Sequence, residues 1–431
     1  MLYPHLGINK EGHLTVGGLD AVALAKEYGT PLYLLDEDVI RENCRTYRAA
    51  AKAAFGENAK ILYASKALSY KGIYRLMAEE GLGVDCVSCG EIRTAVAAGM
   101  PAANIYFHGN NKTDEDLRTA LSLGVGRIVV DNEDELRALS AIAEEMKKRQ
   151  CILLRITPGI DPHTHRAVNT GRVDSKFGSA IATGQAAAIT KEALTLPGVA
   201  LVGYHCHIGS QIFDAEPFLD AARMMLDFAG AIHDETGFPP TELNLGGGFG
   251  VPYTATDPVP SYPDMIAALG KVFDEKIKEH GLPAPAVRLE PGRSLVAAAG
   301  VTLYTVGAVK EIPGFKTYIS VDGGMPDNPR YALYHSQYTA LIANRADAAS
   351  ELTATLAGRC CESGDLLGED MRIARAARGD VLAVLTTGAY NYSMASNYNR
   401  IPRPPIVAIS GENARLAVRR ESFEDLMRNE L

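Results

Sequence analysis

The sequence predicts an α/β fold, in which a (β/α)8 barrel of the TIM type is joined to a β-rich second domain. Two observations predict the barrel: eight short runs rich in β-branched or aromatic residues recur from residue 60 onward, and most are separated by stretches with helical apolar spacing. Strands that alternate with helices pair in parallel through right-handed crossovers, and eight such units close into a barrel. A third observation predicts the second domain, because the sequence changes to strand-like segments after residue 290.

The elements follow in a clear order. The first 30 or so residues look like strand and turn, and the helical stretch DVIRENCRTYRAAAKAAFG comes next. The eight expected barrel strands cover residues 61–65, 83–88, 104–109, 127–131, 151–156, 200–207, 241–246 and 286–290. The longest gap between them, from Thr157 to Val199, contains HTHRAVNTGRVDSKFG. This stretch is polar and punctuated by glycine, so we expect a long loop over the active face there rather than another barrel unit.

Strand-like segments dominate the rest of the chain. They are VTLYTVGAVKEI, KTYISVDGG, DVLAVLTTGAY and PIVAISGENARLAV. At 431 residues the chain exceeds the size at which one core usually stops growing, which favours two domains. We therefore predict a barrel over residues 31–285 and a β-rich domain built from residues 1–30 and 286–431.

Composition and charge narrow the class of partner. The formal net charge is -9 and no basic stripe stands out, which argues against nucleic acid and anionic membranes as partners. No stretch approaches the ~18 apolar residues of a membrane span, and the N-terminus lacks a charged region followed by an apolar run. We expect a cytoplasmic protein that acts on a small molecule.

The cysteines carry little sign of a metal or a disulfide framework. There are seven, an odd number, scattered along the chain, as is typical of reduced thiols. Cys86-x-x-Cys89 has no second pair of ligands at the right spacing, so we expect no metal. The adjacent Cys360 and Cys361 could not both bind one metal or easily bridge each other, which leaves packing or reaction chemistry.

The carboxyl ends of the barrel strands are where reactive groups should lie. The polar residues and glycines at these ends are Lys66, Asp85, His108, Arg155, His205, His207, Gly246–Gly250 and Glu290. Three successive glycines after a strand let backbone N–H groups close around a phosphate, and barrels commonly bind one after strands 7 and 8. Ser210 and the N–H groups beside Arg293 could complete this site. A flexible connection is the plain alternative.

A lysine and an acid at the same strand ends suggest a particular cofactor. A lysine that closes an apolar strand usually extends into water, but partial desolvation at the barrel mouth would favour Schiff-base formation by Lys66. A phosphate cradle, a lysine and an acid for a pyridinium nitrogen are what pyridoxal phosphate requires, and Glu290 is well placed for the acid. Alternation puts His205 and His207 on one face. We favour His207 for stacking on the ring, with the other a satisfied core histidine.

Seven motifs, spread over nearly the whole chain, carry a family resemblance. They are YASKA, GVDCVSCGEI, FHGNNK, HCHIGSQ, LNLGGGFG, EPGR and CESGD. With them the chain resembles the fold-type III pyridoxal-phosphate decarboxylases, and most closely the diaminopimelate decarboxylases. YASKA and EPGR are shared with ornithine and arginine decarboxylases, whereas FHGNNK, GGGFG and CESGD together are more specific. The resemblance implies decarboxylation of meso-2,6-diaminopimelate to L-lysine and CO2, the last step of lysine biosynthesis.

The resemblance also implies roles around the cofactor. Lys66 would form the Schiff base with pyridoxal phosphate, His207 would stack on its ring, and Glu290 would pair with the ring nitrogen. Asp85 and Arg155 would orient the cofactor. The phosphate or the adjoining substrate site would be lined by Ser210, Gly247, Gly248, Gly292 and Arg293. Tyr390 matches a tyrosine that reaches the cofactor and substrate from the β-rich domain, although a partly buried strand tyrosine is the alternative.

The resemblance gives CESGD a role in the reaction. In the family, the cysteine before Glu-Ser lies at a subunit interface and enters the partner's barrel, where it can reprotonate the carbanion left by CO2 loss. This implies that Cys361 is the proton donor and Cys360 a packing residue. It also implies a homodimer with shared active sites, in which the β-rich domain contributes to both site and interface.

The substrate's distal end needs its own partners. Arg293, Arg330 and Tyr334 are candidates for the distal carboxylate, because arginine binds that group through two parallel bonds, and Glu362 is the candidate for the distal amine. Arg330 lies in MPDNPRYALY, which reproduces the family pattern MxDNPRxxLY and favours a dicarboxylic substrate. A solvated loop charge is its alternative.

Three other functions fit parts of the sequence. An ornithine-, arginine- or carboxynorspermidine-type decarboxylase would use the same scaffold, and Arg330 separates it from the dicarboxylic reading. An alanine-racemase-like enzyme shares barrel and cofactor but would need a second catalytic base in place of CESGD. A non-catalytic pyridoxal-phosphate carrier can be little more than a barrel, whereas this chain has a full β-rich domain.

Overall fold

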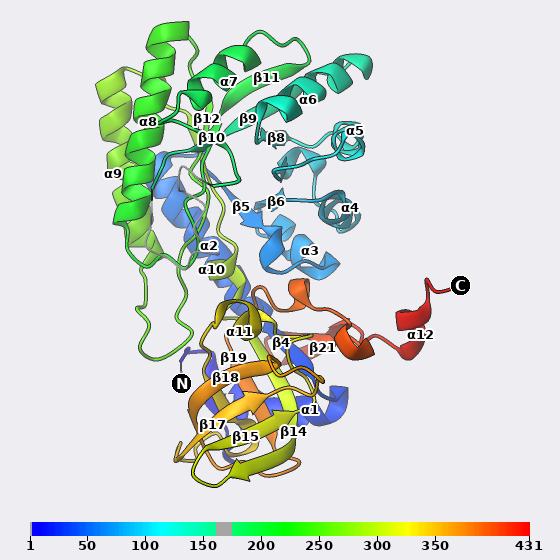
Figure 1. Ribbon diagram of the computed structural model, residues 1–431. Coiled ribbons are helices and arrows are strands. Elements are labelled where there is room, and N and C mark those ends of the chain that lie inside the picture. The colour runs from blue at the N-terminus through cyan, green and yellow to red at the C-terminus, as the bar shows by residue number, and fades with distance from the viewer. Residues whose placement is uncertain (1, 161–174) are drawn as a thin grey trace. The chain divides into compact units, whose positions relative to one another are not determined.

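The computed structural model describes residues 2–160 and 175–431, which form two compact units (Figure 1). The barrel unit comprises residues 43–250 and 259–292, and the β unit comprises residues 1–42, 251–258 and 293–431. Both parts of the predicted fold class are confirmed.

The barrel unit contains all eight predicted strands. They are β5 (Lys60–Ala64), β6 (Gly83–Cys86), β7 (Ile105–Phe107), β8 (Arg127–Val130), β9 (Gln150–Thr157), β11 (Val199–His205), β12 (Glu242–Asn244) and β13 (Ala286–Leu289). Each strand pairs in parallel with the next, and β13 pairs with β5, so the sheet closes. A layer of Leu62, Tyr106, Val129 and Leu153 fills the barrel interior, as expected for a packed core rather than a pore.

Helices alternate with these strands, and their ends follow the local sequence. They are α2 (Glu37–Phe55), α3 (Lys71–Glu79), α4 (Cys89–Ala97), α5 (Asp114–Leu123), α6 (Glu133–Glu145), α7 (Gln185–Ala193), α8 (Glu216–Thr236) and α9 (Tyr262–His280). Helix α5 begins at a capping box of Thr113 and Asp116 and ends at Gly124, which has the left-handed conformation that glycine favours. Across residues 2–160 and 175–431, no helix is long and apolar enough to cross a membrane.

The gap between the fifth and sixth barrel strands differs from the prediction. Its described part contains β10 (Ser179–Ala180), which pairs with β9, and the crossover helix α7. A loop throughout this gap was therefore a wrong prediction over residues 185–193, where the alanine-rich sequence QAAAITKEA has high helix propensity. The rest of the expected loop includes residues 161–174, which lie outside the described residues.

The β unit is built on two sheets. Strands β1 (Leu6–Ile8), β2 (Leu14–Val16) and β3 (Leu19–Asp20) form a small antiparallel sheet, followed by α1 (Ala21–Tyr28). The larger sheet contains β4 (Leu32–Asp36), β14 (Gly300–Ile312), β15 (Lys316–Val321), β16 (Ala340–Ile342), β17 (Leu352–Ala357), β18 (Leu366–Ile373), β19 (Val381–Leu385), β20 (Ile406–Ser410) and β21 (Asn413–Val418). Both sheets contribute to one apolar core that includes Leu14, Leu34, Val301 and Val407.

The predicted domain boundaries need correction at three places. Strand β4 (Leu32–Asp36), which was predicted to lie in the barrel domain, pairs with β14 and β20 and so belongs to the β unit. The boundary after residue 285 is also wrong, because the next residues form β13 and the barrel unit continues to Gly292. Residues 251–258 leave the barrel and belong to the β unit.

Candidate active site

Glu290 is the centre of a buried polar cluster at the carboxyl ends of the barrel strands. It follows β13, and its Oε1 accepts a hydrogen bond from Nδ2 of Asn244 at 2.6 Å. Nε2 of His205 lies 3.1 Å from Oε2, and Nε2 of His108 lies 2.9 Å from Oε1. Burial raises the pKa of Glu290, but the two histidines lower it more, so the pKa lies well below its usual range. The cluster therefore holds an ionised carboxylate inside the barrel.

Asp85, in β6, extends this cluster. Its Oδ1 lies 3.8 Å from Nε2 of His108, and burial raises the pKa of Asp85 to about 6. Burial lowers the pKa of His108, but the charges of Asp85 and Glu290 raise it more. The pKa of His205 is instead lowered to about 4, mainly by burial. His108 is thus the imidazole best placed to carry a proton between two carboxylates.

Lys66 and His207 lie within electrostatic reach of this cluster. Lys66 is exposed and belongs to a short 3-10 turn (Ser65–Ala67) that directly follows β5. The charge of Lys66 lowers the pKa of Asp85, against the effect of burial. Burial and the charge of Lys66 both lower the pKa of His207, which falls well below its usual range. Nδ1 of His207 accepts a hydrogen bond from the backbone N–H of Gly247 at 3.4 Å. His207 is therefore a neutral imidazole beside the glycine run.

The glycine run Gly246–Gly250 directly follows β12 and its neighbour Leu245. Gly248 has a φ of 119°, which side-chain-bearing residues rarely adopt. A Cβ atom on Gly247 would lie 2.0 Å from the carbonyl oxygen of Glu290, and one on Gly248 would lie 2.4 Å from the carbonyl oxygen of Gly209. Only glycine fits at these two positions, because the neighbouring atoms belong to the backbone.

The loop that contains Ser210 is bonded to the glycine run. The N–H of Ile212 donates to the carbonyl of Gly248 at 3.0 Å, and the N–H of Gly250 donates to the carbonyl of Ile212 at 2.8 Å. Gly292 follows β13, and a Cβ atom there would lie 2.9 Å from Cβ of Ala64 in β5. The predicted phosphate residues of the barrel unit, Ser210, Gly247, Gly248 and Gly292, thus come from the ends of β11, β12 and β13.

Arg155, in β9, is held by an aromatic ring and an acid. Its guanidinium carbon lies 4.3 Å from the ring centre of Phe177, and its Nε lies 4.0 Å from Oδ1 of Asp131. Burial raises the pKa of Asp131, although the charge of Arg155 opposes this. Arg155 is therefore paired with Asp131, an acid at the carboxyl end of β8.

Sequence reasoning gave no role to several members of this site. Asn244 and Asp131 were not singled out, and His108 and His205 were seen at strand ends without an assigned partner. Asn244 is the last residue of β12, two residues before the glycine run, and Asp131 directly follows β8. The rule that reactive groups lie at strand ends would have selected both of them.

The β unit contains a second polar group, the arginine cluster, formed by Tyr253, Arg293, Arg330, Tyr338 and Tyr390. Both arginines are buried and begin short helices, α10 (Arg293–Val296) and α11 (Arg330–Tyr334). Nη1 of Arg293 donates to the hydroxyl of Tyr253 at 2.8 Å, and Nη1 of Arg330 donates to the hydroxyl of Tyr338 at 3.0 Å. Arg330 is therefore no solvated loop charge.

Two further members of the predicted substrate site, Tyr334 and Tyr390, lie near these arginines in the chain or in space. The ring centre of Tyr390 lies 4.7 Å from the guanidinium carbon of Arg293. Tyr390 has a φ of 61°, a strained conformation that often occurs at functional sites. Tyr334 is half-buried and is the last residue of α11, the helix that Arg330 begins.

The CESGD motif forms the turn between the antiparallel strands β17 and β18. Buried Asp365 fixes this turn, because its carboxylate accepts hydrogen bonds from the N–H groups of Met325 at 2.6 Å and Cys360 at 2.7 Å. Cys361 and Glu362 are both exposed. Burial raises the pKa of Cys360 to about 12, so this thiol stays protonated at neutral pH. The motif thus combines a fixed backbone with two exposed side chains, a thiol and a carboxyl group.

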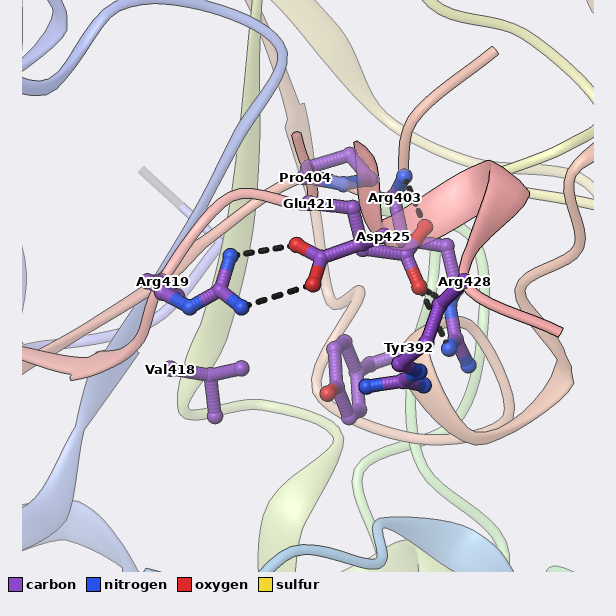
Figure 2. Close-up of a pocket in the computed structure, with 8 residues that line it drawn as sticks. All are labelled: Tyr392, Arg403, Pro404, Val418, Arg419, Glu421, Asp425 and Arg428. Atoms are coloured by element: carbon purple, nitrogen blue, oxygen red, sulfur yellow. Dashed lines mark hydrogen bonds and ion pairs between the residues drawn. The ribbon is translucent and has the colours of Figure 1, made fainter. Parts of the chain in front are cut away.

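One described pocket lies elsewhere in the β unit and has a volume of about 250 Å³ (Figure 2). Its lining residues are Tyr392, Arg403, Pro404, Val418, Arg419, Glu421, Asp425 and Arg428. Arg403 pairs with Glu421, and Arg419 pairs with Asp425, so most of its charges are neutralised internally. None of the predicted site residues lines this pocket, and we assign it no role in the reaction.

Comparison with known proteins first gives the protein family that the barrel unit matches. The family model described as "Pyridoxal-dependent decarboxylase, pyridoxal binding domain" matches residues 38–297. This range includes all eight barrel strands, the glycine run and Glu290.

Individual relatives narrow the class. A diaminopimelate decarboxylase of Bacillus subtilis is 47% identical over 423 residues, which cover 98% of this chain and 96% of the relative. A crystal structure of diaminopimelate decarboxylase from M. jannaschii in complex with L-lysine has a TM-score of 0.92 and 35% identity, covering 99% of this chain and 98% of that one. The Helicobacter pylori enzyme, also complexed with L-lysine, has a TM-score of 0.87 and 31% identity, with 95% and 99% covered. The chain belongs to the diaminopimelate decarboxylase family, and the predicted resemblance is confirmed.

Proposed function

We propose that this chain decarboxylates meso-2,6-diaminopimelate to L-lysine and CO2 with pyridoxal phosphate as its cofactor. The observation that carries the proposal is the buried carboxylate of Glu290, held ionised by His108 and His205 beside a cradle that admits only glycine. A cofactor whose ring nitrogen must stay protonated needs such a carboxylate. The family relatives support the same reaction.

The barrel residues fit pyridoxal phosphate by an independent criterion. Oδ1 of Asp85 and Nδ1 of His205 are buried and have no hydrogen-bond partner among the described residues. Buried polar atoms are normally paired, so orphaned atoms at the strand ends indicate a place for a polar ligand. The glycine run supplies backbone N–H groups for a phosphate. When bound, the cofactor supplies an electron sink for the electron pair that the departing carboxylate leaves behind.

Each barrel residue would hold one part of this cofactor. Lys66 would bind its aldehyde carbon, Glu290 would accept the hydrogen bond of the ring N–H, and neutral His207 would offer a flat face to the ring. Asp85 and Arg155 would orient it. The phosphate would be bound by Ser210, Gly247, Gly248, Gly292 and the N–H groups beside Arg293.

The substrate's distal end would be bound by the β unit. Arg293 and Arg330 would hold the distal carboxylate together with Tyr334 and Tyr390. Two buried guanidinium groups would repel a distal ammonium group, which argues against an ornithine- or arginine-type decarboxylase. Arg330 thus supports the dicarboxylic substrate.

The proton that replaces CO2 would come from Cys361. A thiol on an exposed turn with a fixed backbone is suited to enter a second subunit, and Glu362 beside it would bind the substrate's distal amine. We therefore propose a homodimer with shared active sites. We also assign the reaction to the cytoplasm, where the seven cysteines, all free in the structure, would stay reduced.

Product formation tests the proposal. The purified chain with added pyridoxal phosphate is offered meso-diaminopimelate, L-ornithine and L-arginine separately, and CO2 and amine product are followed. We expect lysine and CO2 from diaminopimelate alone, and no turnover by Lys66→Ala. Turnover of ornithine or arginine would overturn the substrate assignment, and a lack of turnover despite bound cofactor would instead favour a carrier protein.

A further inference from the structure

We infer that Tyr253 is a positioning residue that sets the separation of Arg293 and Arg330 and thereby the affinity for the substrate's distal carboxylate. The inference rests on the proposed function. It adds a residue that contacts both arginines and that neither the sequence motifs nor the family resemblance singled out.

Tyr253 lies between the two arginines. Its buried hydroxyl accepts the hydrogen bond from Nη1 of Arg293 at 2.8 Å. The guanidinium carbon of Arg330 lies 4.8 Å from the centre of the Tyr253 ring, and that of Arg293 lies 5.8 Å from it. One side chain thus contacts Arg293 through its oxygen and Arg330 through its ring face.

Two buried like charges need such a partner. Guanidinium groups repel each other more strongly inside a protein than in water, because the effective dielectric constant is lower. A tyrosine opposes this repulsion with an acceptor oxygen and with a ring face that attracts cations. The two arginines also lower the pKa of Tyr253 against the effect of burial, which agrees with strong attraction between the groups.

The surrounding chain fixes Tyr253 without help from a ligand. The N–H groups of Tyr253 and Thr254 donate to Oδ2 of Asp257 at 2.7 and 2.9 Å. The carbonyl of Tyr253 accepts a hydrogen bond from Oγ1 of Thr339 at 2.9 Å. The Tyr253 ring packs edge-on against Tyr338, with 5.3 Å between ring centres. The tyrosine is therefore held on its backbone and on its ring, and it can act as a fixed spacer.

Tyr338 supports the second arginine in the same way. Its hydroxyl accepts from Nη1 of Arg330 at 3.0 Å and from Nδ2 of Asn391 at 3.4 Å. The Tyr338 hydroxyl thus orients Arg330, and the Tyr253 hydroxyl bonds Arg293. Because Tyr253 contacts both arginines, loss of its hydroxyl should change the distance between them, whereas loss of the Tyr338 hydroxyl should act mainly through Arg330.

The test is Tyr253→Phe, which keeps the ring and removes the acceptor. We expect the KM for meso-diaminopimelate to rise about tenfold while kcat stays within about twofold, because an interaction made equally in ground and transition states is lost. The affinity of the holoenzyme for L-lysine, which retains the distal carboxylate, should fall by a similar factor in calorimetry. The absorbance of the bound cofactor should not change.

The matched control is Tyr106→Phe in the barrel unit. It also removes a buried hydroxyl, which donates to Oε2 of Glu242 at 2.9 Å, and should leave KM and lysine affinity unchanged. Unchanged KM and lysine affinity in Tyr253→Phe, or a fall in kcat alone, would overturn the inference. If Tyr253→Phe does not fold, Thr339→Val, which removes the hydrogen bond that holds the Tyr253 carbonyl, is measured by the same two readouts, and unchanged KM and lysine affinity in that variant would overturn the inference. A lack of turnover by the unaltered chain would defeat the proposed function itself.

Discussion

At the scale of single residues, the site depends on neighbours that are far apart in sequence. Glu290 could be selected as the acid from EPGR and its position after an expected strand. Its partners His108 and His205 could not, because they reach it only when β7, β11 and β13 are brought together by closure of the barrel. Pattern reasoning therefore found the acid but not what keeps it ionised.

Cys361 can be tested against its own neighbour. Cys361→Ala should lower kcat by about 10² or more, since a positioned proton donor typically contributes 10²–10⁴ to a rate. Cys360→Ala is the matched control, because Cys360 is partly buried, and it should retain activity near that of the unaltered chain. Steady-state CO2 release with both variants measures the difference. Equal losses in the two variants would remove the case for Cys361 as the donor.

His205 should make stability depend on pH. Its pKa is about 4 in the folded chain and about 6.5 when unfolded, so between these values only the unfolded chain takes up the proton. The contribution of neutral His205 to the free energy of unfolding is therefore fully present above pH 6.5 and is lost as pH falls toward 4. Between pH 7 and pH 5 this loss amounts to about 2 kcal/mol. His205→Gln should lose less over this interval in urea unfolding. The raised pKa of Asp85 makes the chain more stable as pH falls, but it does so equally in the unaltered chain and in His205→Gln. The same pH dependence of stability in the two chains would contradict the assigned protonation of His205.

At the scale of elements, local sequence patterns predicted the barrel strands, but they did not predict which strands pair when these lie far apart in the chain. All eight barrel strands were predicted, because each is a short apolar run beside a helical stretch. Strand β4 was placed in the wrong domain, since its sequence LYLLD gives no sign that its partners β14 and β20 lie hundreds of residues later. Helix α7 was missed because a polar, glycine-punctuated segment precedes it. The fixed CESGD turn was also not foreseen, since Asp365 acts through backbone N–H groups.

The glycine run gives the element-scale prediction. Gly247→Ala would place a Cβ atom about 2 Å from a backbone carbonyl. The loop must then shift, at a cost of about 1–3 kcal/mol in stability, and affinity for pyridoxal phosphate should fall at least about tenfold. Cofactor titration followed by absorbance measures this change. Gly307→Ala in β14, where the nearest atom lies 3.8 Å from the added Cβ, is the control and should bind cofactor normally.

At the scale of the whole molecule, the predicted residues divide between two units. Lys66, His207 and Glu290 belong to the barrel unit, whereas Arg330 and Cys361 belong to the β unit. The fold class could be predicted from the sequence, and the candidate site residues could be proposed from motifs because each motif is local, but their roles stay predictions. Composition gives no information on the assembly, and the proposed shared site rests on the family resemblance alone.

Mixing two inactive variants tests the shared site. Lys66→Ala and Cys361→Ala chains, unfolded and refolded together in equal amounts, should regain about a quarter of the wild-type sites if each site takes Lys66 from one subunit and Cys361 from its partner. Half of the dimers would then be mixed, and each mixed dimer would have one intact site. CO2 release after mixing measures the recovery, and each variant refolded alone is the control. No recovery would contradict a site shared in this way.

The exposed thiol of Cys361 in the CESGD turn also offers a way to measure association of the subunits. All seven cysteines lie within the described residues, and Cys361 alone among them is exposed. A thiol-reactive dye should therefore mark one position per chain. If that position enters a partner subunit, assembly should shield it, and the rate of labelling should rise on dilution. Labelling of the proposed proton donor would then give the affinity between two subunits in the unaltered chain.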